Sequence, residues 1–206
     1  MPRSLLSRFS IALLVLGISG CSGADLDTPA QSSLPGLTTP AVTPKQAPSA
    51  DADAADYSQL LPTAAELSDA DDTFNQRSQE SQPNGIPGAS AFFVNDEDSR
   101  AISDTFLIYP DADTAKATLR QASGTLTTLV AGGTPTPVPV GTDGVMISGT
   151  HPDEDKAVTL MFFTEGRALV RLEFQSAPGD ATTDRFVTSV GKMQQLALRV
   201  GLSDSQ

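Results

Sequence analysis

The chain has very few of the side chains that build disulfides, zinc sites and catalytic centres. Its 206 residues include one cysteine, one histidine and no tryptophan. A single cysteine excludes an internal disulfide, so a folded domain in this chain must be held together by its hydrophobic core. One histidine supplies too few nitrogen or sulfur donors for a zinc site. The composition therefore argues against a disulfide-stapled domain and against a zinc protein.

Basic residues are scarce as well. Lys and Arg together number 13 against 25 Asp and Glu, which gives a formal net charge of −12 at pH 7. Nucleic-acid binding and adsorption to anionic lipid both depend on basic side chains close to phosphates. The charge balance therefore argues against a nucleic-acid partner and against a folded surface that lies on the membrane.

The sequence also lacks a recognisable catalytic set. It has no Gly-X-Ser-X-Gly elbow and no phosphate-binding loop. His151 stands beside Asp153, Glu154 and Asp155, a combination found in metal sites, but the stretch contains Pro152 and fits a solvated loop better. We therefore predict a protein that is not an enzyme and that holds no metal or other cofactor.

Residues 1–20 predict a secretory signal peptide. Arg3 and Arg8 make the head of the chain basic, and residues 9–18 form a short apolar run. About 20 apolar residues are needed to span a bilayer, so this run is too short for a stable anchor. A basic head, a short apolar run and small residues at the cleavage site are the features of an export signal.

The residues at the cleavage site resemble the lipobox of bacterial lipoproteins. Ile18, Ser19 and Gly20 lead into Cys21, with isoleucine where leucine is usual. The resemblance implies cleavage between Gly20 and Cys21, a diacylglyceryl group on the Cys21 thiol, and fatty-acid (palmitate) chains that anchor the protein. The alternative is an ordinary signal peptide followed by a chance cysteine, which would leave an unpaired thiol in an oxidising compartment.

Residues 21–56 are predicted to form a disordered tether. Proline, threonine, serine and alanine dominate this stretch, and its apolar residues show no period. Such a composition buries too little apolar surface to offset the entropy of ordering, and proline favours extended conformations. The threonines and prolines would suit O-glycosylation, and a bare spacer is the alternative.

A globular domain is predicted over residues 57–202, followed by a short tail, 203–206. It begins with a short helix, Thr63–Leu67, in which Thr63 and Glu66 have the spacing of a capping box. A tight hairpin is predicted with Glu165 and Gly166 as its turn. Strands are predicted at 74–79, 89–94, 101–109, 138–148 (one or two strands), 156–164 and 167–175.

Two amphipathic helices complete the predicted domain. The first runs from Thr114 to Val130 and ends at Gly132, and the second follows Asp180 and ends at Gly201. Their apolar stripes are Ala115, Leu119, Ala122, Leu126 and Leu129, and Phe186, Val190, Met193, Ala197 and Val200. The order of strands, helix, strands and helix predicts an α+β fold: a single antiparallel sheet with both helices packed on one face. The repeated strand–turn–helix unit fits either an internal duplication or an ordinary exit from a strand.

This layout resembles a family of secreted actinobacterial domains, the extracellular sensor domain of the mycobacterial PknH-type kinases and related lipoproteins. The resemblance spans residues 58–202 and rests on Leu60–Leu67, Phe106–Lys116, Val140-Gly141, Gly166–Arg171 and the final helix. It implies a mixed sheet with helices and a cleft that binds an external ligand. The chain lacks the family's disulfide cysteines and tryptophan.

A second apolar sheet face is the candidate ligand site. If Val158, Leu160 and Phe162 face the helices, other large apolar residues point away from them. These are Leu107, Tyr109, Met146, Met161, Phe163 and Leu169. Either residues 57–70, with Leu60, Leu61 and Leu67, fold over this face, or it forms a hydrophobic groove for a lipid, a glycolipid or a partner protein. A register error of one residue would exchange the two faces.

The sequence thus predicts a lipid-anchored protein on the extracytoplasmic side of the cell membrane. Its expected role is that of a ligand-binding or sensor-like module of the envelope, for a hydrophobic small molecule. The alternative is a structural or protein-interaction lipoprotein that docks an envelope protein through its apolar sheet face.

Overall fold

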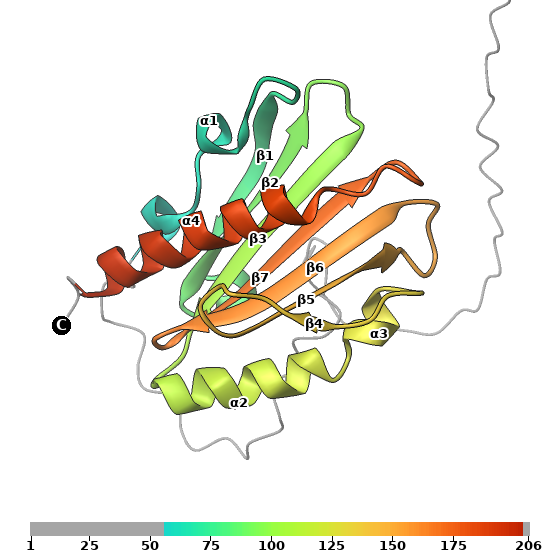
Figure 1. Ribbon diagram of the computed structural model, residues 1–206. Helices are drawn as coiled ribbons and strands as arrows, with labels where there is room; N and C mark the ends of the chain where they lie inside the picture. The colour runs from blue at the N-terminus through green and yellow to red at the C-terminus, as the bar shows by residue number, and fades with distance from the viewer. Residues whose placement is uncertain (1–55, 204–206) are drawn as a thin grey trace, which may run out of the picture. The chain divides into compact units, whose positions relative to one another are not determined.

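The structure is a computed structural model that describes residues 56–203. The predicted signal peptide, the lipidation of Cys21 and almost all of the predicted tether lie outside the described residues, so these remain predictions. The described part contains one antiparallel sheet with the strand order β1-β2-β3-β7-β6-β5-β4 (Figure 1). The strands are β1 Phe74–Ser81, β2 Gly88–Asn95, β3 Arg100–Ile108, β4 Thr136–Pro137, β5 Thr142–Thr150, β6 Ala157–Glu165 and β7 Ala168–Ser176. The predicted α+β class with a single antiparallel sheet is confirmed.

Helices precede, interrupt and end the sheet. Two short 3-10 helices are η1 Ser58–Leu60 and η2 Pro83–Gly85; the α-helices are α1 Ala64–Leu67, α2 Ala112–Ser123, α3 Leu126–Leu129 and α4 Asp184–Ser203. The predicted capping box is present in α1: the Glu66 amide donates to Thr63 Oγ1, and the Thr63 amide donates to Glu66 Oε2. The predicted order of strands, helix, strands and helix is therefore correct for the long elements.

The two long helices cover opposite faces of the sheet, so the prediction that both pack on one face is wrong. Val187, Val190 and Leu198 of α4 pack with Met161 and Phe163 of β6, in what we call the α4-side core. Figure 1 shows α4 lying across this face, with α1 beside it. A second cluster, the α2-side core, joins helix and strand residues from the other face: Leu119, Ala122, Leu126, Leu160 and Phe162.

The strand β6 explains the error. Its residues from Ala157 to Thr164 are all buried, although successive side chains point to opposite faces. An unbroken apolar run of this kind is typical of a strand covered on both sides, whereas strict alternation is typical of a strand with one wet face. The run of Leu160, Met161, Phe162 and Phe163 carried the signal for two covered faces.

The helix α2 follows its predicted stripe but ends early. Asp111 caps it by accepting a hydrogen bond from the Thr114 amide at 2.7 Å. Ala115, Leu119 and Ala122 are buried, as predicted. The helix ends at Gly124 rather than at Gly132, and the predicted stripe continues in the separate helix α3, where Leu126 is fully buried.

The helix α4 follows its predicted stripe only in part: Val190 is buried, and Phe186 and Met193 pack against the α4-side core. Val187, Val190, Gly191, Gln194 and Leu198 are buried, whereas Val200 is 57% exposed. The buried face of α4 is set by Gly191 and Gly201, which pack directly against neighbouring side chains. A Cβ atom on Gly191 would lie 2.7 Å from Met161 Sδ, and one on Gly201 would lie 2.2 Å from Leu60 Cδ2. The absence of a side chain lets the helix approach its neighbours, so Gly201 is a contact point within α4 and not its stop.

The β6–β7 hairpin is present with its turn one residue later than predicted. Glu165 pairs with Ala168, which leaves Gly166 and Arg167 as the two turn residues. Gly166 has φ +56°, a conformation that glycine adopts at little cost. Val170, Leu172 and Phe174 alternate with Arg171 and Glu173 along the strand, and all three belong to the α4-side core.

Candidate functional site

The six residues predicted to form an apolar ligand face do not come together. Met146, Met161 and Phe163 belong to the α4-side core, whereas Leu169 and Tyr109 belong to the α2-side core. Leu107 pairs with Leu169 across β3 and β7 and is 1% exposed, so it lies on the α2 side as well. The prediction of a shared open face is wrong because each face carries its own helix.

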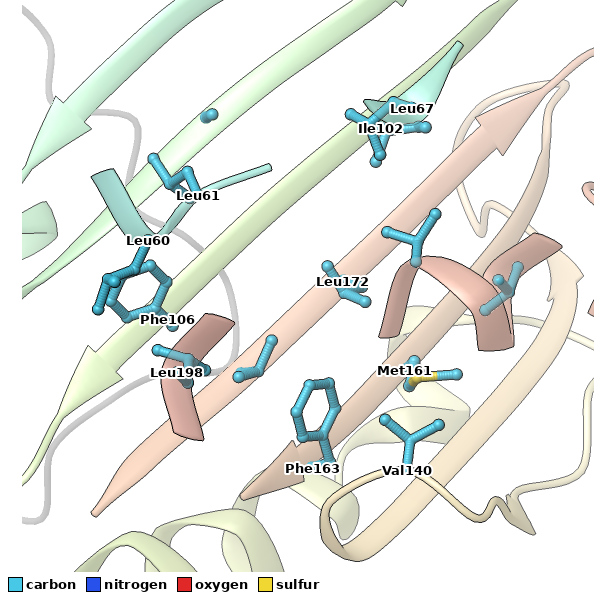
Figure 2. Close-up of a cluster of buried hydrophobic side chains, with 14 of the residues drawn as sticks. Leu60, Leu61, Leu67, Ile102, Phe106, Val140, Met161, Phe163, Leu172 and Leu198 are labelled. Carbon is cyan, nitrogen blue, oxygen red and sulfur yellow. The ribbon is translucent and has the colours of Figure 1, made fainter. Parts of the chain in front are cut away.

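The alternative interpretation, a cover formed by residues 57–70, is confirmed. Leu60, Leu61 and Leu67 pack into the α4-side core together with Met161 and Phe163. Figure 2 shows these side chains converging with Ile102, Phe106, Leu172 and Leu198. The α4-side core is therefore closed by two pieces, the segment 57–67 and α4, which we call the cover.

A cavity of about 190 Å³ opens at the end of this core, where α4 begins. Its apolar wall consists of Phe74, Ile102, Phe174 and Phe186. Its polar rim consists of Asp69, Asp71, Asp72, Arg100, Thr182 and Thr183. Three separate parts of the chain meet here, namely the loop between α1 and β1, the start of β3, and the connection from β7 into α4.

Phe186 is the centre of the aromatic wall. Its ring stacks on Phe74 with centroids 6.4 Å apart and 18° between the planes. Phe174 meets the same ring edge-on, at 6.2 Å and 82°. Both arrangements are favourable for aromatic pairs, so the wall is held in shape. Phe74 and Phe174 are buried and Phe186 is half-buried, so Phe186 is the ring that the cavity exposes most.

Arg100 holds the rim together. Its guanidinium lies 3.1 Å from Asp72 Oδ2 and 2.5 Å from Asp180 Oδ2, so it joins the loop before β1 to the loop before α4. Asn95 supports this arrangement, because its amide donates to Asp72 Oδ1 at 2.7 Å and its Oδ1 accepts from the Arg100 amide at 2.9 Å. Ion pairs and hydrogen bonds therefore hold the rim in place, and Arg100, the one cationic side chain that lines the cavity, is already paired with Asp72 and Asp180.

The carboxylates leave the rim negative. Asp69 accepts backbone hydrogen bonds from Asp72 and Asp71, which lower the pKa of its carboxyl group. Asp71 is exposed and makes no side-chain hydrogen bond within the described residues. Four aspartates therefore surround Arg100, counting Asp180, and their field favours a positively charged group near the cavity.

Asp104 is the most unusual residue near the cavity. It lies on β3 two positions beyond Ile102, on the same face of the sheet, and it is 0% exposed. Neither carboxyl oxygen has a hydrogen-bond partner among the described residues. Burial raises the pKa of Asp104 to about 8, so the group is mainly neutral at pH 7.

The other predicted polar positions have structural roles. His151 Nδ1 accepts hydrogen bonds from the backbone amides of Asp153 and Glu154, as in a loop tip. Within residues 56–203, no group of three or more metal-ligating side chains comes together. Two further hollows, of about 410 and 280 Å³, have no aromatic wall; they lie beside Arg199 and Lys156 respectively. The aromatic cavity is therefore the best candidate site.

Sequence reasoning missed this cavity because its residues are far apart along the chain. The sequence assigns Phe74 and Phe174 to two separate strands and Phe186 to the apolar stripe of the last helix. Each ring had a plausible core role by itself. Only the pairing of β3 with β7, which brings Ile102 opposite Phe174, assembles the wall.

Comparisons with known proteins give no family for this chain. No protein-family model matches the chain, and no curated protein does. A solved structure, the crystal structure of the extracellular domain of PknH from Mycobacterium tuberculosis, is weakly similar, with a TM-score of 0.49 and 10% sequence identity. The match covers 68% of this chain and 93% of that one. No helix within residues 56–203 is long and apolar enough to cross a membrane.

Proposed function

We propose that the chain is a membrane-anchored bacterial lipoprotein whose α+β domain binds a small ligand on the extracytoplasmic side as a sensor-like module. The observation that carries the binding role is the cavity of about 190 Å³ with its aromatic wall and polar rim. Small-ligand sites are typically concave and apolar with a few placed polar groups. The lipobox-like sequence before Cys21 supports the anchor.

The volume of the cavity limits the size of the ligand that can bind in it. Drug-sized molecules occupy cavities of roughly 300–1,000 Å³, so a smaller molecule suits this one. A long lipid chain does not fit in this volume, and the sheet faces that could have held one are covered. We therefore place the proposed site in this cavity and not on a sheet face. The proposed ligand is a small molecule with an aromatic or apolar group, and not a lipid.

The proposed function is non-enzymatic. The polar groups around the cavity are carboxylates, threonines and one arginine that is bound by Asp72 and Asp180. The single histidine lies in the loop at 151, among the residues of a different hairpin. A nucleophile paired with a base does not occur at the rim, which supports binding without chemistry.

The test is a titration of the full chain, in mild detergent, with benzyl alcohol as the smallest probe that combines a ring with a polar group. NMR shifts of the Phe74, Phe174 and Phe186 rings should change on binding. Phe186→Ala should weaken the response, whereas Leu196→Ala, an exposed position on the same helix, should not. Shifts that spread over the surface, or equal responses of both variants, would rule out the cavity as the site.

One observation favours the alternative of a protein-interaction lipoprotein. β1 is an edge strand of eight residues, seven of them exposed, and Phe92 on the neighbouring strand is 39% exposed. Such an edge can pair with a strand of another protein. β1 also carries a bulge at Arg77 and the charge of Glu80, features that discourage pairing. Gln79→Pro removes a backbone N–H from β1 and should abolish binding of a partner protein that pairs with this edge strand.

A further inference from the structure

Asp104 occupies the middle of the α4-side core. On β3 it stands between Ile102 and Phe106, which both belong to that core. Ala91 of β2 and Leu172 of β7 are its cross-strand neighbours. All four neighbours are buried and apolar. A strand interior of this kind normally carries another aliphatic residue, so a carboxyl group here needs an explanation.

The charged form of Asp104 has no support in the closed structure. Both oxygens are buried and neither accepts a hydrogen bond from a described residue. An ionised carboxylate without partners in an apolar interior is strongly unfavourable, whereas the protonated acid is tolerated. The folded core therefore holds Asp104 as a neutral acid, in agreement with the direction of its pKa.

The elements packed over Asp104 provide no counter-charge. The cover contributes Leu60, Leu61 and Leu67 from its first piece, and Val187, Val190, Gln194 and Leu198 from α4. On this face β2 and β7 contribute apolar side chains and, at the far ends of the strands, the uncharged Asn95 and Ser176. The titratable side chain packed against this core is Tyr57, which is half-buried, and Arg100 and Asp72 lie at the cavity end, where they pair with each other.

A hydrogen bond from Gln194 joins the two pieces of the cover and leaves one Gln194 atom without a partner among the described residues. Gln194 of α4 donates from Nε2 to the Leu60 carbonyl at 3.1 Å. Its Oε1 is buried and has no hydrogen-bond partner within the described residues. Of the cover, α4 borders the cavity through Phe186, and the loop that follows the segment 57–67 borders it through Asp69 and Asp72. Movement of the cover would therefore change the cavity.

We propose that Asp104 is a proton switch for the cavity: the neutral acid keeps the cover closed on the sheet, and loss of the proton loosens α4 and the segment 57–67. The part of this inference that concerns ligand access rests on the proposed function. The switch itself is a property of the core and needs no ligand. It regulates the same cavity that we propose as the binding site.

The direction of the effect follows from proton linkage. With the cover open, water reaches Asp104 and its pKa falls towards the ordinary value of 3.8; with the cover closed, the pKa is about 8. The closed form therefore binds the proton more tightly, and raising the pH favours the open form. Between these two values the open fraction should grow by up to about tenfold per pH unit. Below and above them it should be constant.

Hydrogen exchange of the full chain in mild detergent, without ligand, tests the switch. Protection factors, corrected for the intrinsic exchange rate, are measured at pH 5, 6, 7 and 8. Amides of α4 and residues 58–67 should lose up to about tenfold protection per unit. Asp104→Asn should abolish this dependence, and Asp155→Asn, at an exposed position, should preserve it. The same pH dependence in Asp104→Asn, or amides of α4 and residues 58–67 that are as strongly protected as those of β6 and β7 at every pH, would overturn the switch.

A second measurement covers the case in which Asp104→Asn does not fold. Infrared spectroscopy of the unaltered chain should show a protonated carboxyl band at pH 7 that disappears above about pH 8. Its absence at pH 7 would overturn the proposal. The two proposals can fail separately: a cavity that binds no probe leaves the exchange result standing. A cavity that binds benzyl alcohol while exchange is independent of pH removes the switch alone.

Discussion

Each face of the sheet buries an ionisable side chain, which has an ion-pair partner on one face and no partner among the described residues on the other. On the α2 side, Arg171 is buried and forms an ion pair with Glu173, which in turn accepts a hydrogen bond from Gln175 at 2.6 Å. On the α4 side, Asp104 is buried with no partner. The two residues lie on neighbouring strands, since Arg171 pairs with Thr105, the residue after Asp104.

This difference indicates where the domain is rigid and where it can respond. A buried ion pair fixes its surroundings, because separating the partners leaves an uncompensated charge. A buried lone acid makes its surroundings depend on one proton. The cavity lies on the side of the lone acid, and its border includes the cover. We infer that the α2 side is the scaffold of the domain and that the α4 side is its responsive half.

The largest effect should come from removing the lone acid. In the unaltered protein the folded state binds the Asp104 proton more tightly than the unfolded state, so its stability should fall as pH rises from about 4 to about 8. A shift of this size has a ceiling of about 6 kcal/mol, at about 1.4 kcal/mol per pKa unit. Asp104→Leu should abolish the fall and increase stability at pH 8. Denaturant unfolding at pH 5 and pH 8 measures both, and parallel curves for the two proteins would contradict the comparison.

Breaking the paired charge on the other face should cost somewhat less. Glu173→Leu leaves Arg171 buried without its partner, and such losses are about 3 kcal/mol. The double variant Arg171→Met with Glu173→Leu removes both charges and should recover most of the stability. Unfolding free energies of the singles and the double form the required cycle. If Glu173→Leu alone is neutral, the α2 side is not held as described.

A smaller loss is expected where the two pieces of the cover touch. Gly201→Val places side-chain atoms against Leu60 and should destabilise the domain by roughly 1–3 kcal/mol. Val200→Ala, at the exposed position next to it, should change stability by less than about 0.5 kcal/mol. Exchange of the 58–67 amides should increase only in the first variant. Equal effects of the two changes would show that the helix end does not depend on this contact.

The smallest effect concerns charge selection at the rim. Benzylammonium should bind more tightly than benzyl alcohol, and benzoate more weakly, because four aspartates surround the one arginine. The differences should be modest, on the order of 1 kcal/mol per charge, and should shrink with added salt. Calorimetry at low and high salt measures the order. A preference for benzoate would mean that Arg100 leaves its aspartates to bind the ligand.

Local patterns predicted most of the elements but not how they meet. The Thr63–Glu66 capping box and the hairpin near Gly166 were predicted from the sequence because each involves residues close together in the chain. The face of the sheet on which α4 packs could not be predicted in this way, because it depends on the direction that the chain takes after β7. The continuous apolar run of β6 indicates a strand that is covered on both faces. The prediction of a single buried face did not take this run into account.

The candidate site was the least predictable part. Its wall depends on three phenylalanines separated by up to 112 residues, and its frame depends on Arg100 meeting Asp180. Asp104 was visible in the sequence as an acid within an apolar strand, between Ile102 and Phe106. That local conflict between a polar residue and a core position is the signal that could have pointed to this half of the domain.

The most direct test of the ligand-binding role is native mass spectrometry of the full chain, purified gently from the cells that produce it. The account predicts a small additional mass, removed by organic solvent, that is lost in Phe186→Asp and retained in Leu196→Asp, with circular dichroism confirming that both variants fold. A bare protein mass in every preparation, or an adduct retained equally by both variants, would contradict the claim that the aromatic cavity is a binding site.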